Sequence, residues 1–230
     1  MYWKTTWKSQ DLSIIVKGKR QDIPEYKPEA NEMLYWNRTN VIQKPGMELV
    51  VPRYYVYEDV PLRTDMRGDS SHIAFDYILD AGRTPIHSYC DLSIGLRHMP
   101  VADTTKYYIV QKAGKWRSSM GGKYANGWIK TRVRSLGTFS VDVDTIAPQI
   151  TPIGQGGWRT SRNIRFRIKD MESGIGSYKV YIDGKFVLFG LKKGILVIQN
   201  PEKVKKGVSH KLEVTVTDQC GNMTRKEYKF

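Results

Sequence analysis

Four turn motifs in the second half of the chain decide its fold. They are Asp144-Thr-Ile-Ala-Pro148, Asp170-Met-Glu-Ser-Gly-Ile175, Ile182-Asp-Gly184 and Val216-Thr-Asp-Gln-Cys-Gly-Asn222. Such residues terminate strands, because Gly accepts positive φ, Pro fixes φ and Asp bonds to its own backbone. The motifs are separated by segments that alternate between apolar and polar residues, which is the period of a half-buried strand. About seven short strands in residues 148–230 are typical of a β-sandwich.

The clearest strand is the segment Asn-Ile-Arg-Phe-Arg-Ile-Lys at residues 163–169. Its apolar residues would face a core, and Arg165, Arg167 and Lys169 would face solvent. Further along, the dipeptide Asp183-Gly184 between two apolar segments predicts a two-residue hairpin.

The first half of the chain follows the same pattern less regularly. Candidate strands cover residues 12–16, 48–57, 73–79, 92–96, 107–111 and 138–143, and residues 28–39 form the best helix candidate. We therefore predict an all-β protein with two β-sandwich domains in tandem. Domain 1 covers residues 45–143, domain 2 covers residues 148–230, and residues 1–44 are an N-terminal extension or the first strands of domain 1.

Charge is unevenly distributed along the 230 residues. The net charge is +14, and residues 148–230 contribute 16 Lys and Arg against seven Asp and Glu. A basic surface favours polyanions such as nucleic acid, anionic lipid or acidic envelope polymers. No apolar run approaches the roughly 20 residues that span a bilayer, and no signal peptide is visible at the start of the chain.

The turn motifs carry a resemblance to known families. The second half, with Asp-Thr-Ile-Ala-Pro at its entry and Val-Thr-Asp-Gln-Cys-Gly-Asn near its last turn, resembles a bacterial immunoglobulin-like domain. Residues 45–230 as a whole resemble the non-catalytic tail of exported lysostaphin-type zinc metallopeptidases. The segments that carry this wider resemblance are 47–52, 55–61, 84–87, 106–110, 121–128 and 136–142.

The resemblance implies an exported, periplasmic or cell-surface protein whose catalytic domain would cleave peptidoglycan. This family's metal site needs H-x-x-x-D together with H-x-H. The chain holds one H-x-x-x-D, from His72 to Asp76, on a predicted strand, but no H-x-H. Because a catalytic zinc needs three protein ligands, we expect no peptidase activity, no metal and no cofactor in these residues.

Three groups of residues are candidates for binding. The first is a basic stripe for a polyanion, and the second is a set of aromatic residues for a glycan. The third is a pair of aspartates near turns, where calcium could bind. Asp also initiates turns without a metal, by hydrogen bonding to its own backbone. The residues are Arg159, Arg162, Arg165, Arg167 and Lys169 for the stripe, Tyr124, Trp128 and Trp158 for the glycan, and Asp144 and Asp218 for calcium.

The expected function is that of a non-catalytic positioning or scaffolding module, the tail of a peptidoglycan metallopeptidase. Its partner would be a cell-envelope polymer such as peptidoglycan, or an envelope protein. The alternative is a free-standing surface adhesion or glycan-binding protein. A nucleic-acid binder has only the charge in its favour, because no recognition motif is present. An enzyme using His72 and Asp76 is a further rival. Cys90 and Cys220 leave open whether a disulfide forms.

Overall fold

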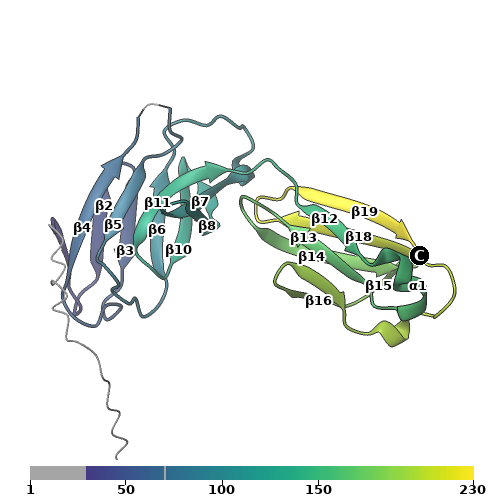
Figure 1. Cartoon of the computed structure of the whole chain (residues 1–230). Coiled ribbons are helices and arrows are strands. Elements are labelled where there is room, and N and C mark those ends of the chain that lie inside the picture. The colour runs from purple at the N-terminus through teal and green to yellow at the C-terminus, as the bar shows by residue number, and fades with distance from the viewer. Residues whose placement is uncertain (1–29, 70) are drawn as a thin grey trace, which may run out of the picture.

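The computed structural model describes residues 30–69 and 71–230, which form two β-sandwiches placed end to end (Figure 1). The predicted all-β fold with tandem sandwiches is confirmed. The predicted strand at residues 12–16 lies outside the described residues.

Two antiparallel sheets make up the first sandwich. The larger sheet contains β1 (Glu32–Leu34), β4 (Val60–Arg67), β5 (Asp76–Asp80), β7 (Tyr107–Ala113), β8 (Trp116–Ser119) and β11 (Gly137–Val143). The smaller sheet contains β2 (Asn40–Lys44), β3 (Met47–Val51), β6 (Cys90–Gly95), β9 (Lys123–Ala125) and β10 (Trp128–Val133). Their strand orders are β1-β4-β5-β11-β7-β8 and β2-β3-β6-β10-β9. A short 3-10 helix, η1 (Thr104–Lys106), precedes β7.

The core of the first sandwich comes from alternate residues of both sheets. In the smaller sheet Leu92 and Ile94 are fully buried, and in the larger sheet Tyr77 and Phe139 are buried opposite them. The Tyr77 hydroxyl donates a hydrogen bond to the Pro45 carbonyl at 2.7 Å, so its polar end is satisfied.

Two four-stranded sheets make up the second sandwich. One contains β12 (Gln149–Ile153), β13 (Arg165–Lys169), β16 (Phe189–Lys192) and β17 (Ile195–Ile198). The other contains β14 (Ile175–Ile182), β15 (Lys185–Phe186), β18 (Lys211–Asp218) and β19 (Met223–Lys229). The orders are β12-β13-β17-β16 and β15-β14-β18-β19. If the strands are lettered A, B, C, C′, D, E, F and G along the chain, the sheets read A-B-E-D and C′-C-F-G. This is the strand order of an immunoglobulin sandwich.

Local sequence explains two features of this sandwich. Asp183 and Gly184 have φ values of 50° and 77° in the β14–β15 turn, as a two-residue hairpin loop requires, so the predicted hairpin is confirmed. Between β12 and β13 the chain forms η2 (Gln155–Gly157) and a single helical turn, α1 (Trp158–Ser161). This turn places Trp158 in the core.

The N-terminal part of the first sandwich differs from the sequence prediction. The helix prediction for residues 28–39 is wrong for the described part, where β1 and turns occur instead. Strands β1 and β2 belong to the sheets of the first sandwich, so residues 32–44 are its first strands. The passage between domains falls at residues 144–148, after β11 and before β12.

Candidate functional site

The outer face of the sheet that contains β13 is the most uniform charged surface of the second sandwich. Cross-strand partners share a face, so the ladder register defines the members of this face. They are Gln149, Thr151, Ile153, Arg165, Arg167, Lys169, Gly190, Lys192, Ile195 and Val197. Four of these residues are basic and none is acidic. We call this surface the cationic face.

The four basic side chains of the cationic face carry uncompensated charge. Among the described residues, no carboxylate forms an ion pair with Arg165, Arg167, Lys169 or Lys192. All four are exposed. The first three belong to the predicted basic stripe and lie exposed on one face, to which the structure adds Lys192 from β16. Binding of a polyanion by this stripe stays a prediction.

The opposite sheet shows that this arrangement is specific to one face. There Arg225 pairs with Glu213, and Lys211 Nζ lies 3.0 Å from the Glu227 carboxylate. Opposite charges alternate across β18 and β19, so the outer face of that sheet offers a polyanion both attraction and repulsion. The cationic face offers attraction alone.

Arg159 and Arg162 do not extend the stripe. The Arg159 Nε donates to the Gly207 carbonyl at 3.0 Å, and the Arg162 guanidinium reaches the Val204 carbonyl at 3.4 Å. Both residues lie around α1 and hold the segment that follows η3 (Pro201–Lys203). Their role in the structure is to fix this loop.

The three predicted glycan contacts do not form one surface. Trp158 is 1% exposed, packs edge-on against Phe166 and donates from its indole nitrogen to the Ile153 carbonyl at 2.9 Å. A buried side chain cannot stack on a surface glycan, so this prediction is wrong for Trp158.

The remaining two glycan candidates belong to the β9–β10 hairpin. Tyr124 pairs with Ile129 and therefore faces the inner side of its sheet, whereas Trp128 pairs with Ala125 and faces the outer side. The hairpin thus separates Tyr124 from Trp128.

The carboxylates of Asp144, Asp170 and Asp218 meet at the boundary between the domains. One oxygen from each lies within 4.8 Å of the others, and Asp144 and Asp218 are buried. The structure therefore brings the two calcium candidates together and adds Asp170. Within the described residues, this is the only cluster of three or more His, Cys, Asp or Glu side chains with such spacing.

Asp144 and Asp218 also have local structural roles. Asp144 accepts hydrogen bonds from the Ser173 amide at 3.0 Å and the Ser173 hydroxyl at 2.5 Å. Asp218 accepts from the amides of Cys220 and Asn222, both at 2.8 Å. Burial raises the pKa of Asp218, the hydrogen bonds from Asn222 lower it, and the charge of Asp144 raises it, with a net upward shift. The turn-forming role of these aspartates is observed, and calcium binding stays a prediction.

Contacts around this cluster join the two sandwiches. The Lys106 ammonium donates to the Cys220 carbonyl at 3.0 Å, and the Tyr108 hydroxyl donates to Glu172 at 3.3 Å. Tyr108, Val110 and Cys220 form a small buried apolar cluster of their own. The two sandwiches are therefore in direct contact through these side chains.

His72 and Asp76 do not share a ligand site. His72 lies in a turn before β5, and its Nδ1 is 3.0 Å from the Asp69 carboxylate. Asp76 forms an ion pair with Lys112 at 2.6 Å. The prediction that His72 lies on a strand is wrong, because the strand begins only at Asp76.

Cys90 and Cys220 are both buried and free, and they belong to different domains. Burial raises the pKa of each thiol to about 11, so both are protonated at neutral pH. Neither thiol has the character of an activated nucleophile.

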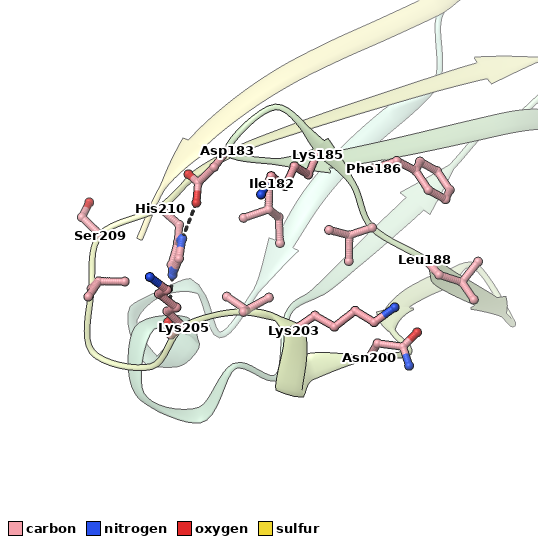
Figure 2. Close-up of a pocket in the computed structure, with 13 residues that line it drawn as sticks. Ile182, Asp183, Lys185, Phe186, Leu188, Asn200, Lys203, Lys205, Ser209 and His210 are labelled. Carbon is pink, nitrogen blue, oxygen red and sulfur yellow. Dashed lines mark hydrogen bonds and ion pairs between the residues drawn. The ribbon is translucent and has the colours of Figure 1, made fainter.

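A cleft in the second sandwich was not predicted from the sequence. It measures about 820 Å³ and lies between the β14–β15 hairpin and residues 200–210 (Figure 2). His210 links its two sides, because its ring nitrogens lie 2.6 Å from the Asp183 carboxylate and 2.8 Å from the Lys205 carbonyl. No sequence motif marks this site, since its residues come from two segments that meet only in the fold.

Comparison with protein families concerns the first sandwich. Residues 31–144 match the family model of the Zu5-like domain. This match begins just before β1 and ends at the linker, so it covers the first sandwich as a unit. A search among curated proteins finds no relative of the chain.

None of the helices in residues 30–69 and 71–230 is long and apolar enough to cross a bilayer.

Proposed function

We propose that this chain is a non-catalytic positioning module of an exported bacterial cell-envelope protein, and that its second sandwich binds an anionic envelope polymer. The observation that carries the proposal is the cationic face, where four basic side chains have no acidic neighbour on the same face. Flat sheet surfaces with one sign of charge attract polymers of the opposite sign and raise their association rate.

Further support comes from the sequence and the domain arrangement. The turn motifs resemble the tail of peptidoglycan metallopeptidases, and peptidoglycan carries carboxylates on its peptide stems. A Zu5-like domain joined directly to a second sandwich suits a modular, adhesion-type protein. In this proposal the chain does no chemistry, and a peptidase domain elsewhere in the same protein would be positioned by it.

Sedimentation of the chain with purified peptidoglycan sacculi tests the proposal. The double variant Arg165→Glu/Arg167→Glu should lose binding, because it reverses two exposed charges without touching the core. The control is Lys179→Glu/Lys229→Glu, which changes the net charge equally on the opposite sheet, and it should retain binding. Equal loss in both variants would show attraction to net charge alone and would refute a specific cationic face.

A second candidate function, a glycan-binding adhesin, is favoured by a different surface. Trp36, Tyr54 and Tyr57 are exposed aromatic residues of the first sandwich, and the rings of Trp36 and Tyr54 lie 5.7 Å apart. Tyr54 has a φ of 67°, a conformation that is rare for a bulky residue and is concentrated at functional sites. Binding to a neutral glycan that survives high salt and is lost in Tyr54→Ala would favour this function over polyanion binding.

A further inference from the structure

The cleft of the second sandwich lies at the end away from the first domain. Strand β14 begins beside the interdomain loops and runs to the hairpin at Asp183, which forms one side of the cleft. The other side is the segment from Asn200 through η3 to His210. Figure 2 shows these two segments facing each other, with the side chains of the cleft between them. A volume of about 820 Å³ is in the range of small-molecule sites.

Apolar side chains form much of the cleft. Ile182 and Val204 are buried members of its lining. Phe186 and Leu188, by contrast, are 61% and 54% exposed although both line the same cleft, and Val208 is exposed on the facing segment. Exposed apolar residues gathered around one concavity mark a surface that is stabilised by covering it.

The charge around the cleft is predominantly positive. Lys185, Lys203 and Lys205 line it, and no described carboxylate forms an ion pair with any of the three. Asp183 is the one carboxylate among the lining residues, and it is occupied by His210. An acidic group that enters the cleft would therefore meet several ammonium groups and no free carboxylate.

His210 holds the two sides of the cleft in place. Both of its ring nitrogens face acceptors, the Asp183 carboxylate and the Lys205 carbonyl, so each nitrogen must carry a proton for both bonds to form. The ring is buried and packs 5.2 Å from the ring of Phe230. This clamp connects the hairpin to the facing loop, so the shape of the cleft is set before a ligand arrives.

We propose that this cleft binds a small anionic amphiphile taken up from solution, with an apolar chain or ring against Phe186, Leu188 and Val204 and one carboxylate, phosphate or sulfonate at the lysines. The apolar lining and the surplus of positive charge together match this chemistry, and neither alone would. The site is separate from the cationic face, so the inference does not depend on the proposed polymer binding.

Titration of the full chain with dodecanoate, followed by amide chemical shifts in NMR, tests this site. Saturable shifts should appear at residues 182–188 and 200–210, and dodecanol, which lacks the charge, should bind at least tenfold more weakly. The variant Lys203→Glu/Lys205→Glu should weaken dodecanoate binding at least tenfold. The control Lys179→Glu/Lys229→Glu should leave it unchanged.

Two results would overturn the inference. One is the absence of saturable shifts at the cleft while the spectrum shows a folded protein. The other is binding to vesicles of anionic phosphatidylglycerol without binding of free dodecanoate, since this would indicate attachment to a bilayer surface. A second variant, Leu188→Asp, changes an exposed residue and should also abolish dodecanoate binding, so a folding defect in the lysine variant cannot hide the answer.

Discussion

Replacing Asp144 by alanine should destabilise the second domain more than any other single change at the domain boundary. Asp144 is fully buried and accepts two hydrogen bonds from Ser173, through its amide at 3.0 Å and its hydroxyl at 2.5 Å. A third bond comes from the Ile146 amide at 2.9 Å. The variant would leave the Ser173 donors buried without their acceptor.

The size of the effect follows from these bonds. A hydrogen bond to a charged group contributes about 1.5–3 kcal/mol, so the two buried bonds to Ser173 contribute about 3–6 kcal/mol. Removing one carboxylate from the cluster relieves repulsion with Asp218, whose pKa the charge of Asp144 helps to raise. We therefore expect a net loss near the lower limit, about 3 kcal/mol. For a domain of this size, that lowers the melting temperature by about 12–24 °C.

Differential scanning calorimetry of the whole chain measures this shift. Ser173→Ala is the matched variant, because it removes the hydroxyl bond alone and should cost less than half as much. The double variant should cost little more than Asp144→Ala, since both changes remove the same contact. A fall of less than about 4 °C in Asp144→Ala, equivalent to roughly 1 kcal/mol, would refute the view that this buried carboxylate organises the boundary.

Three further results are expected. Trp158→Ala should cost the second domain about 3–5 kcal/mol in denaturant unfolding, because it empties a fully buried site; a cost below about 1 kcal/mol would contradict this packing. Burial lowers the pKa of His210. The hydrogen bonds to Asp183 and to a backbone carbonyl raise this pKa by more than burial lowers it, so the net shift is upward. The stabilisation by His210 should therefore be complete below about pH 6.5 and should be lost as the pH rises through the folded-state pKa of His210. If the difference in melting temperature between wild type and His210→Gln stays constant from about pH 5.5 to 9, the result would argue against the clamp. The thiols of Cys90 and Cys220, whose pKa burial raises to about 11, should react with a disulfide reagent at pH 8 only after unfolding, so rapid reaction of the native protein would contradict their burial.

The alternation of side chains made most of the second sandwich predictable. In residues 165–169 every second side chain is basic, and a strand with one dry face is the simplest structure that accommodates this. The turn at Asp183-Gly184 was predictable for a similar reason, because few other dipeptides accept two positive φ values. The helix prediction for residues 28–39 was wrong because short strands and turns leave no clear hydrophobic period in the sequence.

The sites were harder to predict, because they depend on contacts between distant segments. Trp158 was predicted to contact a glycan, but one helical turn directs its side chain into the core. Tyr124 and Trp128 are close in sequence, yet the hairpin register places them on opposite faces. The clamp at His210 joins this residue to Asp183, 27 positions earlier in the chain, and no local sequence pattern predicts such a pair.

The most direct test of the proposed envelope function is the distribution of the protein in fractionated source cells, followed with an antibody to this chain. The account predicts that the wild-type protein is found with the envelope and is released from it by high salt. It also predicts that the Arg165→Glu/Arg167→Glu form moves to the soluble fraction, while Lys179→Glu/Lys229→Glu stays with the envelope. A wild-type protein found in the cytoplasm, or an Arg165→Glu/Arg167→Glu form that remains on the envelope, would contradict the central claim.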